Sequence, residues 1–254
     1  MSGFFAFTKK EFIEHFRTYK IIILAAVFFI FGMFSPLIAK MMPEIFSSLD
    51  MEGIVISIPE PTYLDAYSQF FKNMSQTGLI VVLLVFSGMI TNELTKGTLV
   101  IVLSKGLPRH TVILSKYLVA VILWTLSYAA AAVLNHAYTV YLFGQVSGEG
   151  VLFSLFCLWL FGVFMLAVII LASTVTQGNY GGLLLSAGIL ILLMILNIFP
   201  KCQRYNPVSL AANNAGLIAN TVSVSDLVPT VWITIGLAVF CTLLSLFIFK
   251  EKQL

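Results

Sequence analysis

The residue types that carry chemistry are sparse in this chain and do not stand at catalytic spacings. The phosphate-binding pattern GxxxxGK[ST] is absent, and the nearest string, Thr95-Lys96-Gly97-Thr98, lacks the upstream glycine and the preceding strand. Neither HExxH nor GxSxG occurs, and the three cysteines lie far apart without a metal-binding pattern. We therefore predict no catalytic residue, no metal site and no cofactor bound by this chain itself.

Charged groups that could coordinate or relay an ion are also missing from the apolar runs. No Asp, Glu, Lys or Arg falls in the central part of any predicted span, although ion and proton pathways usually need such groups at that depth. His136 follows Asn135 near the outer end of one span. A lone histidine at that position is more often a structural hydrogen-bonding residue than a catalyst, so we do not assign it a reaction.

One polar segment, residues 91–116, has an ordered layout between two apolar runs. Gly97 permits a backbone turn, and Thr98 can cap a short apolar helix over residues 99–104. Pro108 then begins the return into the next span. Such a helix is too short to span a membrane. Held at the membrane face by two spans, it could pass motion from a soluble partner to the membrane part.

The elements that would hold this segment are apolar helices. The chain of 254 residues is 59% hydrophobic and only 10% charged, whereas soluble domains carry about 25% charged residues. Its net charge of +3 is too mild to indicate nucleic acid binding. The fold class that we predict is an all-α integral membrane protein in a single domain, 1–254. Its six transmembrane helices are expected at residues 21–38, 74–90, 117–141, 151–173, 180–199 and 228–249.

An N-terminal helix is predicted before the first span, at residues 3–19. Phe5, Phe12, Phe16 and Tyr19 fall on one face of this helix, with charged residues on the other. Aromatic residues opposite charges suit a helix that lies in the headgroup plane of a membrane. An ordinary solvated helix is the alternative.

The lysines and arginines of the loops indicate the orientation. Ten of the 14 fall on the side that holds both termini and residues 91–116, and four fall on the other side. Positive residues are enriched in cytoplasmic loops, so we predict that both termini and segment 91–116 are cytoplasmic. Residues 40–77 and 200–227 are then the larger extracellular segments.

Two further features concern helix packing and transport. Gly178, Gly182 and Ser186 stand at four-residue spacing, which lets another helix approach closely, within the chain or across a dimer. Asn197, near the outer end of the fifth span, could face a translocation path. Capping of the helix end is the alternative role of that residue.

With this layout in view, the chain resembles the membrane subunits of type-2 ABC exporters. Their inner loop typically reads as an acid, Gly-Thr, an apolar run, Leu-Ser, Pro, Arg and then a lysine that opens the third span. The matching positions are Glu93, Gly97, Thr98, Leu103, Ser104, Pro108, Arg109 and Lys116. The resemblance extends over the whole chain. It departs from the family pattern at Lys105-Gly106-Leu107 and where Pro108 directly precedes Arg109.

The resemblance implies a role and a set of partners. The chain would be a permease in a bacterial plasma membrane, paired with a second copy of itself or a related permease. Two separate ATPase subunits would bind ATP and Mg²⁺, and segment 91–116 would couple their motion to the spans. The apolar spans suit a hydrophobic or amphipathic cargo in contact with membrane lipid; peptides, including antimicrobial or cytolytic ones, are favoured, and lipids or drugs are possible.

Two other classes remain open from the sequence alone. A secondary transporter that works without ATP would show inverted repeats and broken helices, and neither is evident. A membrane sensor or immunity protein that binds a partner is the second alternative. An ATPase gene beside this one would favour the exporter.

Overall fold

The computed structural model describes residues 2–48, 60–144, 146, 150–176, 178 and 180–252, and every regular element among them is helical. The longer helices are α1 (Ser2–Arg17), α2 (Lys20–Ser48), α3 (Tyr63–Asn73), α4 (Leu79–Phe86), α7 (Arg109–Phe143), α8 (Val151–Val175), α9 (Gly181–Leu196) and α13 (Val224–Glu251). The shorter ones are the π-helix η1 (Met74–Gly78), α5 (Thr91–Thr95), α6 (Thr98–Ser104), α10 (Pro200–Gln203), α11 (Ser209–Ala212) and α12 (Asn214–Ile218).

The predicted class of all-α membrane protein is confirmed. Within the part of the chain that the structure describes, five helical stretches are long and apolar enough to cross a membrane. They are Lys20–Ile45, Tyr63–Thr95, Arg109–Phe143, Val151–Val175 and Val224–Glu251. The fifth predicted span corresponds to α9, which is apolar but has only 16 residues, so the count of six stays a prediction.

The boundaries around the first outer segment differ from the expected ones. Helix α2 continues to Ser48 instead of ending near residue 38, and α3 begins at Tyr63 instead of residue 74. The early start of α3 has a local cause: the backbone N–H and hydroxyl of Thr62 both donate to the Asp65 carboxylate, at 2.8 and 3.0 Å, in a capping box. The middle of the expected loop 40–77, residues 49–59, lies outside the described part of the chain.

The Tyr63–Thr95 stretch is not a uniform helix. The π-helical turn η1 joins α3 to α4, and residues 87–90 form turns before α5 begins at Thr91. A π-turn contains one residue more than an α-turn would, which changes the direction in which the following side chains point.

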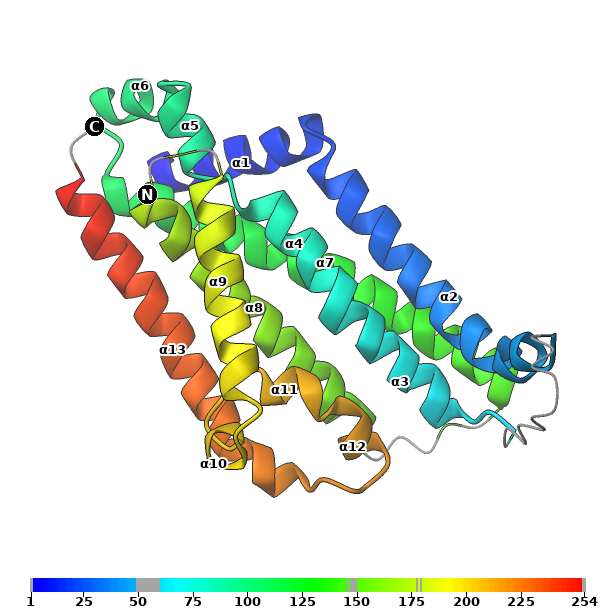
Figure 1. Cartoon of the computed structure of the whole chain (residues 1–254). Helices are drawn as coiled ribbons and strands as arrows, with labels where there is room; N and C mark the ends of the chain where they lie inside the picture. The colour runs from blue at the N-terminus through cyan, green and yellow to red at the C-terminus, as the bar shows by residue number, and fades with distance from the viewer. Residues whose placement is uncertain are drawn as a thin grey trace.

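Helices α7 and α8 form the centre of the molecule. Helices α2 and α3 pack on α7, while α9 and α13 pack on α8 (Figure 1). Trp124 of α7 donates from Nε1 to the carbonyl oxygen of Trp159 at 3.0 Å, and Trp159 donates to Thr125 Oγ1 at 2.9 Å. Gly162 makes room for the indole, because a Cβ there would lie 2.2 Å from Trp124. These bonds satisfy polar atoms that the surrounding apolar side chains cannot.

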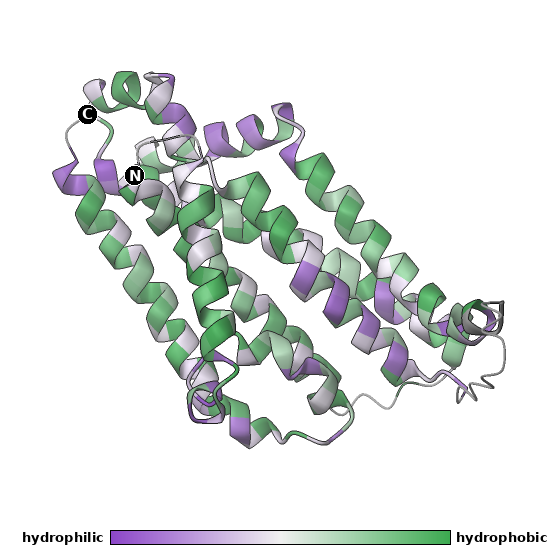
Figure 2. Cartoon of the chain, viewed as in Figure 1, coloured by the Kyte–Doolittle hydropathy of each residue, from purple (hydrophilic) through white to green (hydrophobic). Residues whose placement is uncertain are grey.

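The two ends of the bundle differ. Helix α1 lies across one end, together with α5, α6, the start of α7 and the last turn of α13, and both chain termini lie there (Figure 1). We call this the α6 end. The end of α2, the start of α3 and the short helices α10 and α12 lie at the opposite end. Hydrophilic residues gather on α1 and α5 at the α6 end and along α3 (Figure 2).

The segment expected as extracellular, 200–227, is largely folded. Helices α10, α11 and α12 form within it, and α11 and α12 pack against α8. Leu210 and Leu217 are buried there. The segment is therefore part of the packed bundle and not a free loop.

Candidate coupling site

The turn between α5 and α6 is set by a glycine. Gly97 has a φ of +70°, in the left-handed region that favours glycine, and it is the residue that caps α6. Helix α6 thus begins at Thr98, one residue earlier than expected. The Thr98 hydroxyl does not cap α6; it donates to the carbonyl oxygen of Glu93 at 3.3 Å. The two short helices are in this way bonded to each other.

Buried charges hold α5 in place. Lys116, which is 2% exposed, has its ammonium nitrogen 2.8 Å from Glu11 Oε2 and 3.1 Å from Glu93 Oε2. Lys10 contacts Glu93 as well, and lies 3.0 Å from Glu11 and 2.6 Å from Glu14. We call these five residues the ion network. It joins α1, α5 and α7, so residues more than eighty positions apart in sequence share one cluster.

Each charge in the ion network depends on the others, because an unpaired buried charge is costly. Burial alone would lower the pKa of Lys10, but hydrogen bonds to Glu14 and Glu93 outweigh it and raise that pKa. Burial would likewise raise the pKa of Glu14, and the hydrogen bond from Lys10 outweighs it and lowers that pKa. The contacts of Lys10 and Glu14 therefore stabilise the charged forms of these two side chains.

The three carboxylates of the ion network offer oxygens that lie within 4.8 Å of one another, a spacing that a metal ion could use. Two ammonium groups, those of Lys10 and Lys116, already contact them. Each of the three carboxylates thus has at least one ammonium partner within the chain, and we assign no metal to this cluster.

Beside the ion network, His15 is buried on the same face of α1 as Glu11. Its ring packs edge to face on Phe86, with centroids 5.6 Å apart. Burial is the main cause that lowers the pKa of His15 to about 4. Neither ring nitrogen has a hydrogen-bond partner among the described residues. The imidazole is therefore neutral near pH 7.

The N-terminal helix is present, and its outward face is the aromatic one. Phe5, Phe12 and Phe16 are exposed, whereas Phe7 and Glu11 face the protein. A face of exposed aromatic side chains suits contact with lipid, although the position of α1 in a membrane stays a prediction.

The exit of the loop is fixed by Arg109. Its guanidinium donates to the carbonyl oxygens of Phe249, Lys250 and Lys252 at 3.1, 3.0 and 2.6 Å. These carbonyls close α13, and a cation is favourable at a helix C-terminus. Lys252 in turn donates to the carbonyl oxygen of Thr174 at 2.7 Å. Arg109 therefore links the loop to α13, and through Lys252 to the end of α8.

The outward side of α6 is partly apolar. Leu99 is fully buried, while Val100 and Ile101 are 42% and 57% exposed. Leu103 is half-buried, and the Ser104 hydroxyl donates back to the carbonyl oxygen of Ile101 at 2.9 Å. Helix α6 thus anchors one side in the protein and presents apolar side chains on the other.

The structure brings together some of the expected loop residues and separates others. Glu93, Thr98 and Lys116 lie in or against the ion network, whereas Gly97 and Pro108 shape the turns on either side of α6. The sequence did not single out Lys10, Glu11 and Glu14 as partners of this loop. Their charge could have indicated them as partners, because acidic residues and lysines are rare in so apolar a chain.

Two of the three residues in the predicted packing stripe, Gly182 and Ser186, are buried within this chain. A Cβ at Gly182 would be 2.7 Å from the carbonyl oxygen of Ser87, so this glycine permits close approach to the end of α4. Ser186 is buried, and its hydroxyl donates to the carbonyl oxygen of Gly182 at 2.6 Å. Gly178 is exposed and precedes α9, with no atom within 4 Å of a Cβ built there.

Asn197 closes the far end of α9. It is the capping residue of that helix, and its side-chain oxygen accepts a hydrogen bond from Ser209 at 2.8 Å. Its carbonyl oxygen accepts another from Gln203 at 2.9 Å. These contacts give Asn197 a structural role at the turn from α9 to α11.

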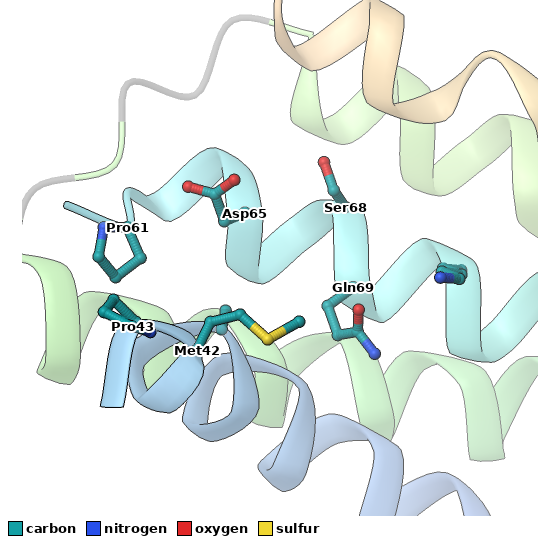
Figure 3. A pocket seen from close by; sticks show the side chains of 8 residues that line it. Met42, Pro43, Pro61, Asp65, Ser68 and Gln69 are labelled. Carbon is teal, nitrogen blue, oxygen red and sulfur yellow. The ribbon is translucent and has the colours of Figure 1, made fainter. Parts of the chain in front are cut away.

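A pocket of about 270 Å³ opens at the opposite end, between α2 and α3 (Figure 3). Met42 and Pro43 line it from α2, and Asp65 and Gln69 from α3. The Asp65 carboxylate accepts the two capping bonds from Thr62. In this pocket Asp65 thus has a structural role at the start of α3.

Comparisons with known proteins agree with this architecture. The family described as ABC-2 family transporter protein matches residues 5–240. The Bacillus subtilis (strain 168) protein described as uncharacterized transmembrane protein YxlG is 26% identical over 149 residues, which cover 58% of this chain and 58% of that protein. This chain thus matches less than two thirds of that relative. From the match over nearly its whole length, the chain belongs to the ABC-2 family of transporter proteins, as a membrane permease.

Proposed function

We propose that this chain is the membrane subunit of an ATP-driven exporter, and that α5 and α6 form its docking element. A separate ATPase, in two copies, would bind ATP and Mg²⁺ and hydrolyse the ATP. Two permease chains, identical or related, would form the pathway across a bacterial plasma membrane. The termini and α6 would face the cytoplasm, in keeping with the ten basic residues on that side.

The observation that carries the proposal is the contrast between the two sides of α6. Its inner side is anchored by Leu99 and, through Thr98, by the ion network. Its outer side exposes Val100 and Ile101 at an end of the molecule that is otherwise rich in charge. A firmly held helix with exposed apolar side chains suits a groove on a protein partner.

The ion network and Arg109 give the docking element two connections to the bundle. A displacement of α5 would move Glu93 relative to Lys116 on α7, and a displacement of the α6–α7 turn would move Arg109 relative to α13. Both α7 and α13 pack on α8 at the centre of the molecule. Motion of an ATPase could therefore reach the central helices through short, charged contacts.

For the cargo, we propose a hydrophobic or amphipathic molecule, with peptides favoured. The support is the absence of charge from the central part of the predicted spans, which would leave an ion without ligands. Export as the direction rests on the resemblance of the loop to type-2 exporters.

The proposal is tested by purifying the chain with a candidate ATPase from the same organism. Ile101→Asp places a charge on the exposed side of α6 and should abolish co-purification, while Ile101→Val should preserve it. Glu93→Gln leaves the outer side of α6 intact, so we expect the ATPase still to bind but its stimulation by cargo in nanodiscs to be lost. Normal binding and stimulation in both Ile101→Asp and Glu93→Gln would refute the docking role.

A further inference from the structure

A second pocket, of about 420 Å³, lies at the opposite end of the molecule from the ion network. It is formed by the first turns of α3 and α8 and the last turns of α7. Tyr67, Ala132, Val133, His136 and Leu152 line it. This volume is in the range of sites for small organic ligands. The Arg109–Phe143 and Val151–Val175 stretches that border it are both long and apolar enough to span a membrane.

The pocket opens towards the surroundings of the bundle. Val133 is 69% exposed and Leu152 is 80% exposed, although both are large apolar residues. In a membrane-spanning helix, such residues face hydrocarbon. The opening is therefore continuous with the part of the surface that lipid chains would cover.

Among its described lining residues, the pocket has a polar pair, with a hydrogen bond of 2.7 Å between the Tyr67 hydroxyl and His136 Nδ1. A phenol carries one donor proton and an imidazole at least one, and the bond between them uses only one of these. Whichever group donates, the pair retains at least one free donor. The other lining residues named above are apolar, so the pocket favours a neutral acceptor and not an anion.

If α3 enters the bilayer at its first residue, the Tyr67–His136 pair would lie in the ester layer. Tyr67 lies four residues after the start of α3 at Tyr63, which corresponds to about 6 Å along a helix. The interfacial layer between headgroups and hydrocarbon is about 5–8 Å thick on each side. A carbonyl of a glycerolipid ester would meet the free donor at this level while its chain continues into the apolar pocket.

We propose that this pocket binds one acyl chain of a membrane glycerolipid, with the ester carbonyl accepting a hydrogen bond from the Tyr67–His136 pair. The site is separate from α6 and needs no ATPase. It can therefore be tested on this chain alone, and its failure would leave the proposed exporter function untouched.

The test uses vesicles of phosphatidylethanolamine and phosphatidylglycerol that contain a trace of photoreactive phosphatidylglycerol with a diazirine on one chain. The probe is made in an ester-linked and an ether-linked form, because the ether lacks the carbonyl. After illumination, adducts are located by peptide mass spectrometry. We expect labelling of peptides that contain Ala132–His136 and Leu152, with the ester form labelling about two- to tenfold more than the ether form, as one hydrogen bond would give.

The variants make the test specific. Tyr67→Phe and His136→Phe each leave one donor, so each single variant should retain the ester preference, whereas the double variant should lose it. Ala132→Phe should fill the pocket and reduce its labelling severalfold, while Ala130→Phe, at an exposed position of the same helix outside the pocket, should not.

Three results would overturn the assignment. Equal labelling by the ester and ether probes in the wild-type protein would show general contact with lipid only, and this comparison holds even if Ala132→Phe folds poorly. Unchanged labelling in a folded Ala132→Phe protein would place the chain outside the pocket. Loss of the adduct on addition of a hydrophobic peptide, at a constant ratio of probe to unlabelled glycerolipid, would assign the pocket to peptide.

Discussion

The two ends of this molecule are held together by different kinds of contact. At the α6 end, α1, α5 and α7 meet through the buried charges of the ion network, and Arg109 closes α13. At the opposite end, charged groups such as Lys40 and Asp65 are exposed, and less exposed contacts, such as Tyr67 with His136 and Ser209 with Asn197, are neutral. A buried charge that loses its partner is destabilising by several kcal/mol, whereas a neutral hydrogen bond contributes about 1 kcal/mol.

This difference suits different tasks. A buried charge needs a partner in every conformation, so charged contacts limit the protein to a small number of distinct conformations. A coupling element requires such distinct conformations. Neutral contacts allow small adjustments at little cost. Mutations at the α6 end should therefore lower the free energy of unfolding more than mutations at the opposite end. Ranking the variants by this loss tests the comparison.

The largest effect is expected from Lys116→Met. The substitution keeps the length of the side chain but removes the charge that lies between Glu11 and Glu93. We expect the free energy of unfolding to fall by about 3–5 kcal/mol, since two carboxylates lose a buried partner. Thermal or denaturant unfolding in detergent measures it. Lys105→Met, at an exposed site of the same end, should change it by less than about 0.5 kcal/mol.

The next effect is a dependence on pH that comes from His15. Its pKa is lowered from 6.5 to about 4 in the folded protein, so the unfolded chain binds the proton first as the pH falls. The contribution of neutral His15 to the free energy of unfolding is fully present above pH 6.5 and is lost as the pH falls from 6.5 to about 4. Over this range the free energy of unfolding falls by at most about 1.4 kcal/mol per pH unit. Glu14, whose pKa is also lowered, removes further stability below its unfolded value of 4.5.

Unfolding of the protein at pH 7, 5.5 and 4.5 measures this slope. In His15→Phe the part between pH 6.5 and 4.5 should disappear, while His136→Phe, at the opposite end, should keep it. An unchanged slope in His15→Phe would mean that other groups at the α6 end cause the acid sensitivity.

A smaller effect is expected from Arg109→Gln, which removes a charged donor from three carbonyl oxygens at the end of α13. Hydrogen bonds to charged groups contribute about 1.5–3 kcal/mol, and we expect a loss of that order. Hydrogen exchange should show faster opening of residues 245–252. Arg17→Gln, exposed on α1, is the matched control; equal exchange in both variants would contradict the link between the loop and α13.

The smallest effect is expected from Ser209→Ala at the opposite end. The hydroxyl of Ser209 lies 2.8 Å from Asn197 Oδ1 and 2.6 Å from the carbonyl oxygen of Gln203. We expect a loss of about 0.5–1.5 kcal/mol, because the bond is neutral. Asn197→Ala should add little to Ser209→Ala if the two share one contact. A cost for Ser209→Ala as large as that of Lys116→Met would remove the contrast between the ends.

The sequence was sufficient to predict the fold class and most of the helices, because runs such as Val151–Val175 are apolar throughout and read directly as spans. It was less informative where a helix is polar. The α3 segment carries Asp65 and Lys72 and was predicted to be a loop, although Thr62 and Asp65 stand at the spacing of a capping box. That spacing could have indicated the start of a helix.

Within the candidate site, the loop residues Glu93 and Lys116 could be selected from their order in the sequence, but their partners could not. Glu11 differs little from Glu14 when α1 is considered alone, and only the packing of α1 on α7 buries Glu11 while Glu14 stays half-exposed. Arg109 was expected to take part in coupling to an ATPase, and its bonds to the end of α13 could not be predicted. Both outcomes depend on contacts between distant parts of the chain, which helical periodicity does not contain.

The π-turn η1 has a consequence for how the length of this protein can change. An α-turn holds about 3.6 residues, and a π-turn takes up about one more in the same turn. One residue removed from Met74–Gly78 would therefore convert η1 to an α-turn and leave the helix after it in register. One residue removed from the continuous helix α4 would instead rotate everything after it by about 100° and turn the carboxylate of Glu93 away from Lys116.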